Sequence, residues 1–135
     1  MKEPVWLDER TALALHDRLL ALDGGLAGIR DEGLLKPALV RPQQYWIYAD
    51  QADFIAPAAL YTASVVRNHP FADGNKRTGF VLGVLFLELN GYRFNASEED
   101  AAQAVIALAA GTLAEVGYTA FLHENVVLQQ DSVSS

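Results

Sequence analysis

The segment from Asn68 to Phe80, NHPFADGNKRTGF, leads from a histidine through a turn into a long apolar stretch. Asp73-Gly74-Asn75 is a turn signal, and residues 75–90 then predict a helix that ends at Asn90-Gly91. Apolar residues fall on every side of this helix, which is typical of a helix buried at the centre of a domain. Its polar residues gather at its first turn, so the segment predicts a central helix whose N-terminus faces an opening.

Two cations, Lys76 and Arg77, are the first charged residues of this helix. The N-terminus of a helix carries about half a positive charge, so each cation there costs about 0.3–1 kcal/mol. Free backbone N–H groups at a helix start bind anions, and Gly74 allows a ligand to approach the backbone closely. The two cations are therefore explained if a phosphate completes the site, bound by Arg77 as a fork and by Lys76 as a point charge.

The residues before the helix supply further chemistry. Asp73 is a candidate Mg²⁺ ligand, because this ion is typically held by one or two carboxylates together with substrate phosphates. His69 is a candidate general base. A base, a metal-binding acid and a phosphate clamp are the components of phosphoryl or nucleotidyl transfer to a hydroxyl. Taken singly, His69 could only shape the turn and Asp73 could only cap the helix, while Phe71 is expected to anchor the loop on the core.

The rest of the sequence predicts an all-α domain of about six helices. Ser97 followed by Asp100 resembles a capping box, and Pro37 is expected to break or bend the second helix. The other helices are predicted over residues 8–22, 31–40, 56–67, 98–111 and 118–129. With 135 residues, the chain predicts a single domain over 1–130, followed by a disordered tail over 131–135.

Two other segments carry predictions. Residues 41–54, RPQQYWIYADQADF, contain period-two hints and three aromatic residues, which predict an extended loop or small hairpin. The glycines of DGGLAGIR, residues 23–30, predict a turn that ends a helix rather than a phosphate loop, because no strand precedes them. His16 and His123 are expected on the surface or, with their hydrogen bonds satisfied, in the core.

Composition excludes several classes of function. The chain has no Cys, which excludes disulfides, zinc–thiolate sites and thiol nucleophiles. Its net charge of −7 argues against direct binding of nucleic acid. The longest apolar run, Phe80–Leu87, is far short of the roughly 20 residues that cross a bilayer. No secretory signal is apparent in MKEPVWLDER, so we expect a soluble cytoplasmic protein.

Residues 69–77, HPFADGNKR, resemble the motif of the Fic/Doc superfamily, which is H-x-F-x-(D/E)-G-N-x-x-R in the Fic branch. Every position through Asn75 matches. Fic proteins that transfer AMP usually have Gly after this Asn, then Arg and a second Arg three residues later, whereas this chain has Lys76, Arg77 and Phe80. That pattern resembles the death-on-curing (Doc) toxins. Residues 25–43, GLAGIRDEGLLKPALVRPQ, also resemble the Doc group, so the resemblance covers nearly the whole chain.

The resemblance implies a Fic/Doc-like bundle around the central helix, with a small extended flap. It implies that His69 is the general base, that Asp73 holds Mg²⁺ and that Phe71 anchors the loop. The nucleotide phosphates would lie in an anion hole made by Gly74, Asn75, Lys76 and Arg77. The flap would align the backbone of a target protein by strand addition, with Tyr45, Trp46, Ile47 and Tyr48 as its central residues.

The reaction implied by the Doc pattern is protein phosphorylation. In Fic enzymes the α-phosphate of ATP lies near the base, and AMP is transferred. In the Doc pattern Lys76 would occupy that space, and the γ-phosphate would face His69. The family target is a threonine of elongation factor Tu, whose modification halts translation. The sequence has no (S/T)-x-x-x-E-(G/N) inhibitory helix, so the family implies a small Phd-like antitoxin, in trans, that covers the flap and groove.

Two alternatives stay open at this point. AMP transfer remains possible because Gly74-Asn75 are also Fic-like and Lys76 is a single residue. A non-catalytic module that binds a nucleotide or a partner is the other alternative, although His69 and Asp73 are both present.

Overall fold

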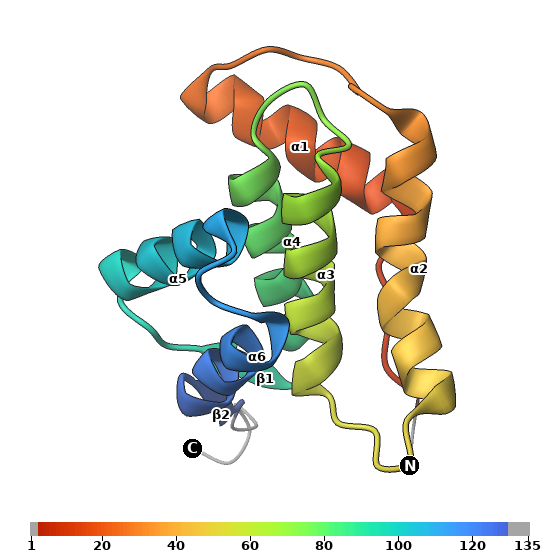
Figure 1. The fold of residues 1–135 in the computed structure, drawn as a ribbon, viewed down its shortest axis with the longest axis vertical. Coiled ribbons are helices and arrows are strands. Elements are labelled where there is room, and N and C mark those ends of the chain that lie inside the picture. The colour runs from red at the N-terminus through yellow and green to blue at the C-terminus, as the bar shows by residue number, and fades with distance from the viewer. Residues whose placement is uncertain (1–2, 130–135) are drawn as a thin grey trace.

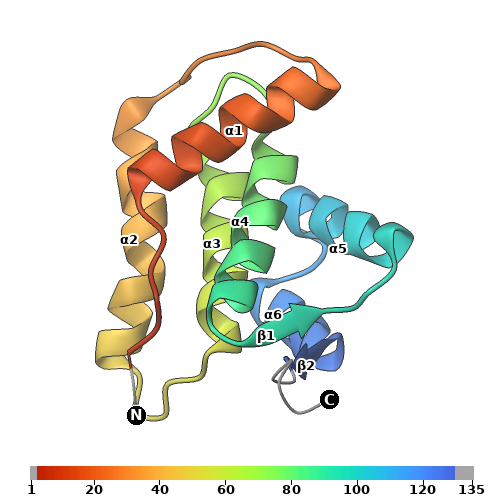
Figure 2. The same ribbon diagram turned by 180° about the vertical axis from the view of Figure 1, so that it is seen from behind.

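A computed structural model describes residues 3–129 of the chain (Figures 1 and 2). In this part of the chain six helices and one two-stranded antiparallel sheet are present, which confirms the predicted all-α class. The elements in chain order are α1 Glu9–Asp23, α2 Glu32–Tyr48, α3 Ile55–Asn68, α4 Asn75–Leu89, β1 Tyr92–Phe94, α5 Glu98–Ala110, α6 Glu115–Glu124 and β2 Val126–Leu128. None of the described helices is long and apolar enough to cross a membrane.

Helices α3 and α4 form the centre of the fold, and their axes run side by side in both views (Figures 1 and 2). Gly79 and Gly83 of α4 allow this close approach, since a Cβ on Gly83 would lie 2.9 Å from the carbonyl oxygen of Ala58. Helix α4 is not buried on every side, because Val81 and Val84 are only partly buried and line a cleft. Apolar residues therefore occur on every side of α4 because one face packs in the core and another lines the cleft.

The capping box predicted at α5 is present. The Ser97 side chain is the N-cap and accepts a hydrogen bond from the Asp100 N–H at 3.1 Å. Helices α1 and α2 begin in the same way, with Asp8 and Asp31 as N-caps that accept from Thr11 and Gly33. Each of these helix starts depends on a short polar side chain followed by a helical segment.

The prediction that a flap follows a short second helix is wrong. Helix α2 continues through Pro37 and Pro42 to Tyr48, and no strand lies between residues 41 and 54. The loss of two helical N–H donors is offset because Leu35, Ala38, Leu39 and Pro42 bury one face of α2 against the core.

The four residues predicted for the flap therefore lie in the last turn of α2. Trp46 packs edge-on against Trp6 and Phe54, at ring distances of 6.2 and 5.2 Å. The Tyr45 hydroxyl accepts from the Asp53 N–H, while Ile47 and Tyr48 are exposed. In Figure 1 this end of α2 lies at the opposite end of the molecule from the loop that joins α3 to α4.

The last predicted helix, over 118–129, is also partly wrong. Helix α6 ends at Glu124, and Asn125 closes it by donating from its side chain to the Phe121 carbonyl at 2.8 Å. Residues 126–128 instead form β2, which pairs antiparallel with β1 in the register Tyr92↔Leu128. Two adjacent valines favour a strand once a partner strand is available. The tail predicted over 131–135 lies outside the described residues.

Candidate functional site

The loop between α3 and α4, residues 69–74, carries the predicted site. His69 ends α3 in the left-handed conformation, with φ 52°, and is the only non-glycine residue with positive φ among the described residues. This conformation costs a residue other than Gly roughly 1–2 kcal/mol. Gly74, with φ 78°, is the N-cap of α4. The chain therefore reverses between two left-handed residues, and the histidine lies at the edge of the turn.

Asn75 holds this loop in shape. Its side chain is buried, its Oδ1 accepts from the Phe71 N–H at 3.0 Å, and its Nδ2 donates to the Phe71 carbonyl at 3.0 Å. The same Nδ2 lies 3.2 Å from Nδ1 of His69. The Phe71 N–H can donate to the oxygen of the Asn75 amide but not to its NH2 group, so this contact determines the orientation of the Asn75 amide. The Asn75 side chain is thus bound within the loop. The backbone N–H of Asn75 is the group that remains at the N-terminal end of α4.

Phe71 attaches the loop to the core. Its side chain is fully buried and stacks on the ring of His16, with the ring centroids 3.8 Å apart and the planes 9° apart.

The first turn of α4 has free backbone donors. No side chain caps this helix, and the first helical bond is donated by the Thr78 N–H to the Gly74 carbonyl at 2.9 Å. The N–H groups of Asn75, Lys76 and Arg77 therefore have no acceptor within the helix. The side chains of Lys76 and Arg77 are exposed at the same helix end. The arrangement combines three N–H donors and two cations, which suits a multiply charged anion.

Asp73 lies beside this helix end with an exposed carboxylate. Oδ1 accepts from the Gly74 N–H at 2.8 Å, and Oδ2 accepts from the Leu26 N–H at 3.2 Å. An ionised carboxylate has about four lone-pair positions, so both oxygens retain the capacity to bind a cation. The described residues contain no cluster of three or more His, Cys, Asp or Glu side chains placed to hold a metal ion. Asp73 therefore fits the role of a single protein ligand whose ion is also held by phosphate and water.

The site opens into a cleft of about 1110 Å³ between α1, α4 and α5. One end of the cleft is polar and contains His69, Asp73, Lys76 and Arg77. The other end is mostly apolar, with Glu98 as its charged residue, and is lined by residues of α4, β1 and α5, including Phe80, Val84, Phe94, Val105 and Ile106. The structure thus brings the sequence-predicted residues of the loop together at one cleft and leaves those of the predicted flap at the far end of α2.

Residues 6–87 match the model of the Fic/DOC family. The chain belongs to the Fic/DOC family. It is 36% identical over 87 residues to "Protein kinase doc" of Escherichia phage P1, across 64% of this chain and 69% of that protein. It is also 41% identical over 75 residues to "Toxin Doc" of Mycolicibacterium smegmatis, across 54% of this chain and 57% of that protein. These relatives confirm the predicted resemblance to the Doc branch.

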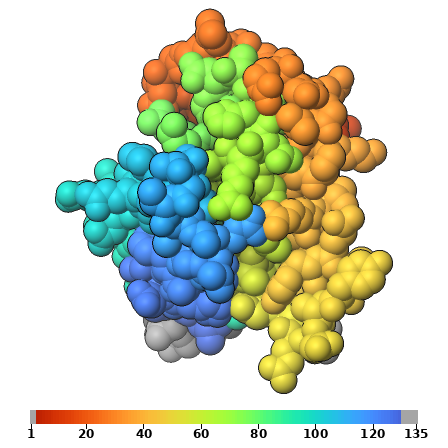
Figure 3. All heavy atoms as spheres, viewed as in Figure 1, coloured from red at the N-terminus to blue at the C-terminus, as the bar shows by residue number. Residues whose placement is uncertain are grey.

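A segment that sequence reasoning missed lies across the Fic/DOC loop. The Gly28 carbonyl accepts from the Ala72 N–H at 3.1 Å, and the Arg30 N–H donates to the Pro70 carbonyl at 2.7 Å. The Arg30 side chain also donates to the carbonyls of His69 and Asn68, at 2.6 and 2.9 Å. On one face of the molecule the orange atoms between α1 and α2 border the green atoms of the loop (Figure 3). The glycines of residues 23–30 therefore do more than end a helix, since they let this segment pack against the Fic/DOC loop.

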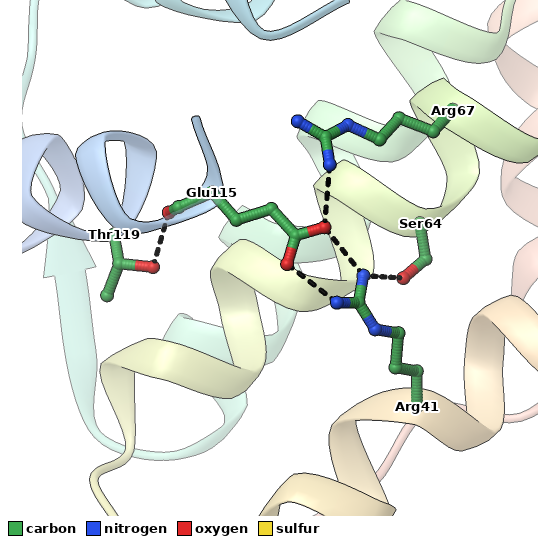
Figure 4. A network of polar contacts seen from close by, with 5 residues as sticks. All are labelled: Arg41, Ser64, Arg67, Glu115 and Thr119. Atoms are coloured by element: carbon green, nitrogen blue, oxygen red, sulfur yellow. Dashed lines mark hydrogen bonds and ion pairs between the residues drawn. The ribbon is translucent and has the colours of Figure 1, made fainter. Parts of the chain in front are cut away.

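Arg67, in the last turn of α3, lies two residues before His69 but does not line the cleft. Its guanidinium donates to Glu115 at 3.0 Å, and Arg41 donates to both oxygens of the same carboxylate at 2.7 Å (Figure 4). Hydrogen bonds from Arg41 lower the pKa of the Glu115 carboxyl, and the charges of Arg41 and Arg67 add to this effect. This cluster joins α2, α3 and α6 and is separate from the Fic/DOC site.

Proposed function

We propose that this protein is a Doc-type toxin that transfers the γ-phosphate of ATP to a Ser or Thr hydroxyl of another protein. The observation that carries the proposal is the convergence of His69, Asp73 and the open N-terminus of α4 at one end of a single cleft. The relative named "Protein kinase doc" supports this reaction class.

Each group at the polar end of the cleft has a role in this reaction. The N–H groups of the first turn of α4, with Lys76 and Arg77, bind the phosphates. Asp73 holds Mg²⁺, which when bound neutralises charge on the phosphate oxygens. The target hydroxyl oxygen forms a bond to the γ-phosphorus while the bond from that phosphorus to the bridging β–γ oxygen breaks. The hydroxyl proton passes to His69, and ADP leaves.

The ring of His69 must change its hydrogen bonding to act as this base. An amide nitrogen can only donate, so the contact from Asn75 Nδ2 makes His69 Nδ1 an acceptor and places the proton of the neutral ring on Nε2. A proton can be accepted at Nε2 only in the other tautomer, which breaks that contact. The contact is long, at 3.2 Å, and the second hydrogen of Asn75 Nδ2 still donates to the Phe71 carbonyl at 3.0 Å. The exchange therefore removes only a weak hydrogen bond.

Two positions favour γ-phosphate transfer over AMP transfer. Lys76 follows Asn75 where AMP-transferring Fic proteins usually have Gly, and Phe80 stands where their second Arg stands. Both residues line the cleft, so they act on the space that the nucleotide occupies.

The substrate and partner follow from the Doc relationship. We propose a translation protein, elongation factor Tu, as the target, which requires a cytoplasmic location. A Phd-like antitoxin would restrain the toxin by covering the cleft. The apolar end of the cleft, between α4 and α5, offers a surface against which a segment of the antitoxin can pack.

The test is label transfer from ATP that carries the label on either the α- or the γ-phosphate. Purified protein would be incubated with Mg²⁺ and a bacterial lysate, with His69→Ala as the control. We expect transfer of the γ-label only, and its loss in the control. Transfer of the α-label would replace this proposal with AMP transfer. Transfer of neither label by a folded protein would leave a module that binds a nucleotide or a partner.

Lys76→Gly, which restores the Fic residue at this position, tests the role of the lysine. We expect a loss of about tenfold or more in γ-label transfer, because the variant loses a phosphate-binding cation and opens space for the other nucleotide orientation. Lys36→Gly, on α2 and outside the cleft, is the matched control. An unchanged rate in Lys76→Gly would contradict the assigned role.

A further inference from the structure

His16 of α1 lies directly beneath the Fic/DOC loop. Its side chain is 2% exposed, and its Nε2 lies 2.7 Å from the carbonyl oxygen of Asp73, a residue 57 positions later in the chain. A carbonyl oxygen can only accept, so Nε2 must carry the proton and donate. The contact therefore determines both the tautomer of His16 and the direction of the Asp73 carbonyl.

The peptide bond between Asp73 and Gly74 is held at both of its ends. His16 binds its C=O, and the N–H of Gly74 donates to Oδ1 of Asp73 at 2.8 Å. In a planar trans peptide these two groups point in opposite directions. The carboxylate of Asp73 thus takes its position from a peptide plane whose other side is fixed by His16.

Packing around His16 supports the same arrangement. Its ring stacks on Phe71, and a Cβ on Gly74 would lie 3.7 Å from the Cδ2 and Nε2 atoms of His16. The histidine therefore contacts Phe71 and Asp73 of the loop and lies beside Gly74. It also lines the cleft, although its own polar nitrogen is bound to the backbone.

We propose that His16 is a positioning residue of this site, which fixes the Asp73–Gly74 peptide plane and so directs the Asp73 carboxylate toward its cation. The proposal rests on the proposed function, in which Asp73 holds Mg²⁺. A residue that only filled the core would act through its ring volume, whereas a positioning residue acts through the hydrogen bond from Nε2. The two roles are separable by substitution.

The test compares His16→Phe with His16→Gln. Phe keeps a ring that stacks on Phe71 but donates no hydrogen bond, whereas the Gln amide can donate to the same carbonyl. Loss of a residue that orients a metal ligand typically costs about 10–100-fold in metal affinity or activity. We expect His16→Phe to raise the Mg²⁺ concentration for half-maximal γ-label transfer by about that factor, with His16→Gln recovering most of the loss. His123→Phe and His123→Gln, on α6, are the matched controls.

A second readout does not depend on catalysis. The Gly74 amide can be followed by ¹⁵N NMR and hydrogen exchange, and we expect it to lose protection in His16→Phe but not in His16→Gln. In the unsubstituted protein, ¹⁵N NMR should show the His16 proton on Nε2, which tests the hydrogen bond even if His16→Phe does not fold. A proton on Nδ1 would overturn the proposal.

The remaining outcomes are distinguishable. If a folded His16→Phe keeps the Mg²⁺ dependence and the Gly74 protection of the unsubstituted protein, the positioning role is wrong. If His16→Phe and His16→Gln lose activity equally, in proportion to their lost stability, His16 is only a core residue. If the unsubstituted protein transfers no label, the proposed function fails, while the Gly74 amide and the His16 tautomer still decide the role of His16.

Discussion

Arg77 forms an ion pair with Asp23, the last residue of α1. The guanidinium assigned to phosphate binding is therefore held by a carboxylate of the same chain at the mouth of the cleft. Both side chains are about half exposed, so the pair is weak and can open. A phosphate that binds at the start of α4 competes with Asp23 for Arg77.

Replacing Asp23 by Asn should therefore strengthen nucleotide binding. An exposed ion pair contributes at most about 1 kcal/mol, which corresponds to a decrease in Kd for MgATP of up to about fivefold. The measurement is titration calorimetry on Asp23→Asn, with Asp17→Asn as a control that removes the same charge from an exposed position on α1. Equal gains in both variants would indicate a net-charge effect. Weaker binding in Asp23→Asn would show that Asp23 contributes to the bound state.

Asn75→Ala should cost both stability and activity. The variant leaves the buried N–H and C=O of Phe71 without partners, and each unsatisfied group costs about 1–3 kcal/mol. We expect the free energy of unfolding, measured with urea, to fall by about 2–4 kcal/mol. Asn125→Ala removes a single side-chain hydrogen bond at the end of α6 and should cost about 1 kcal/mol. If the two variants lose the same stability, Asn75 does not organise the loop.

The features that could be predicted from sequence depend on residues close together in the chain. The capping box of Ser97 and the extent of α4 are of this kind. The Fic/DOC loop was also predictable, since its chemistry is confined to residues 69–77.

The features that were missed depend on contacts between distant residues. His16 contacts Asp73 across 57 positions, and Arg30 contacts His69 across 39. The one local signal for His16 was its spacing four residues after Ala12, on the buried face of α1. Helix α2 continues past its prolines because tertiary burial outweighs their helix propensity, which a local pattern does not reveal.

Glu115→Gln should destabilise the protein in a pH-dependent way. Hydrogen bonds from Arg41 lower the pKa of the Glu115 carboxyl below its usual value of 4.5. A carboxyl whose pKa is lowered by folding stabilises the protein above its unfolded pKa, and this contribution is lost as the pH falls through the folded pKa. We expect Glu115→Gln to lower the free energy of unfolding by about 1 kcal/mol at pH 7, because the partly exposed pair is screened by solvent.

The pH dependence distinguishes this pair from a general effect of charge. The difference between Glu115→Gln and the unsubstituted protein should shrink as the pH falls below 4.5. Glu124→Gln is the control, because this exposed residue of α6 forms no ion pair with the described residues. A difference for Glu115→Gln that stays constant with pH would show that the charge of Glu115 does not stabilise the fold.

Gly83→Ala tests the contact between α3 and α4. A Cβ at this position would lie 2.5 Å from Thr62 Oγ1 and 2.9 Å from the Ala58 carbonyl, so the helices must separate. Overpacking of this kind typically costs about 1–3 kcal/mol.

Gly117→Ala on α6 is the matched control, because its Cβ would meet only the end of the Leu113 side chain, which can move. In an unstrained helix Ala is more stable than Gly by about 1 kcal/mol. Urea unfolding should therefore show a loss for Gly83→Ala and no loss for Gly117→Ala, whereas a gain in both would mean that α3 and α4 adapt without strain.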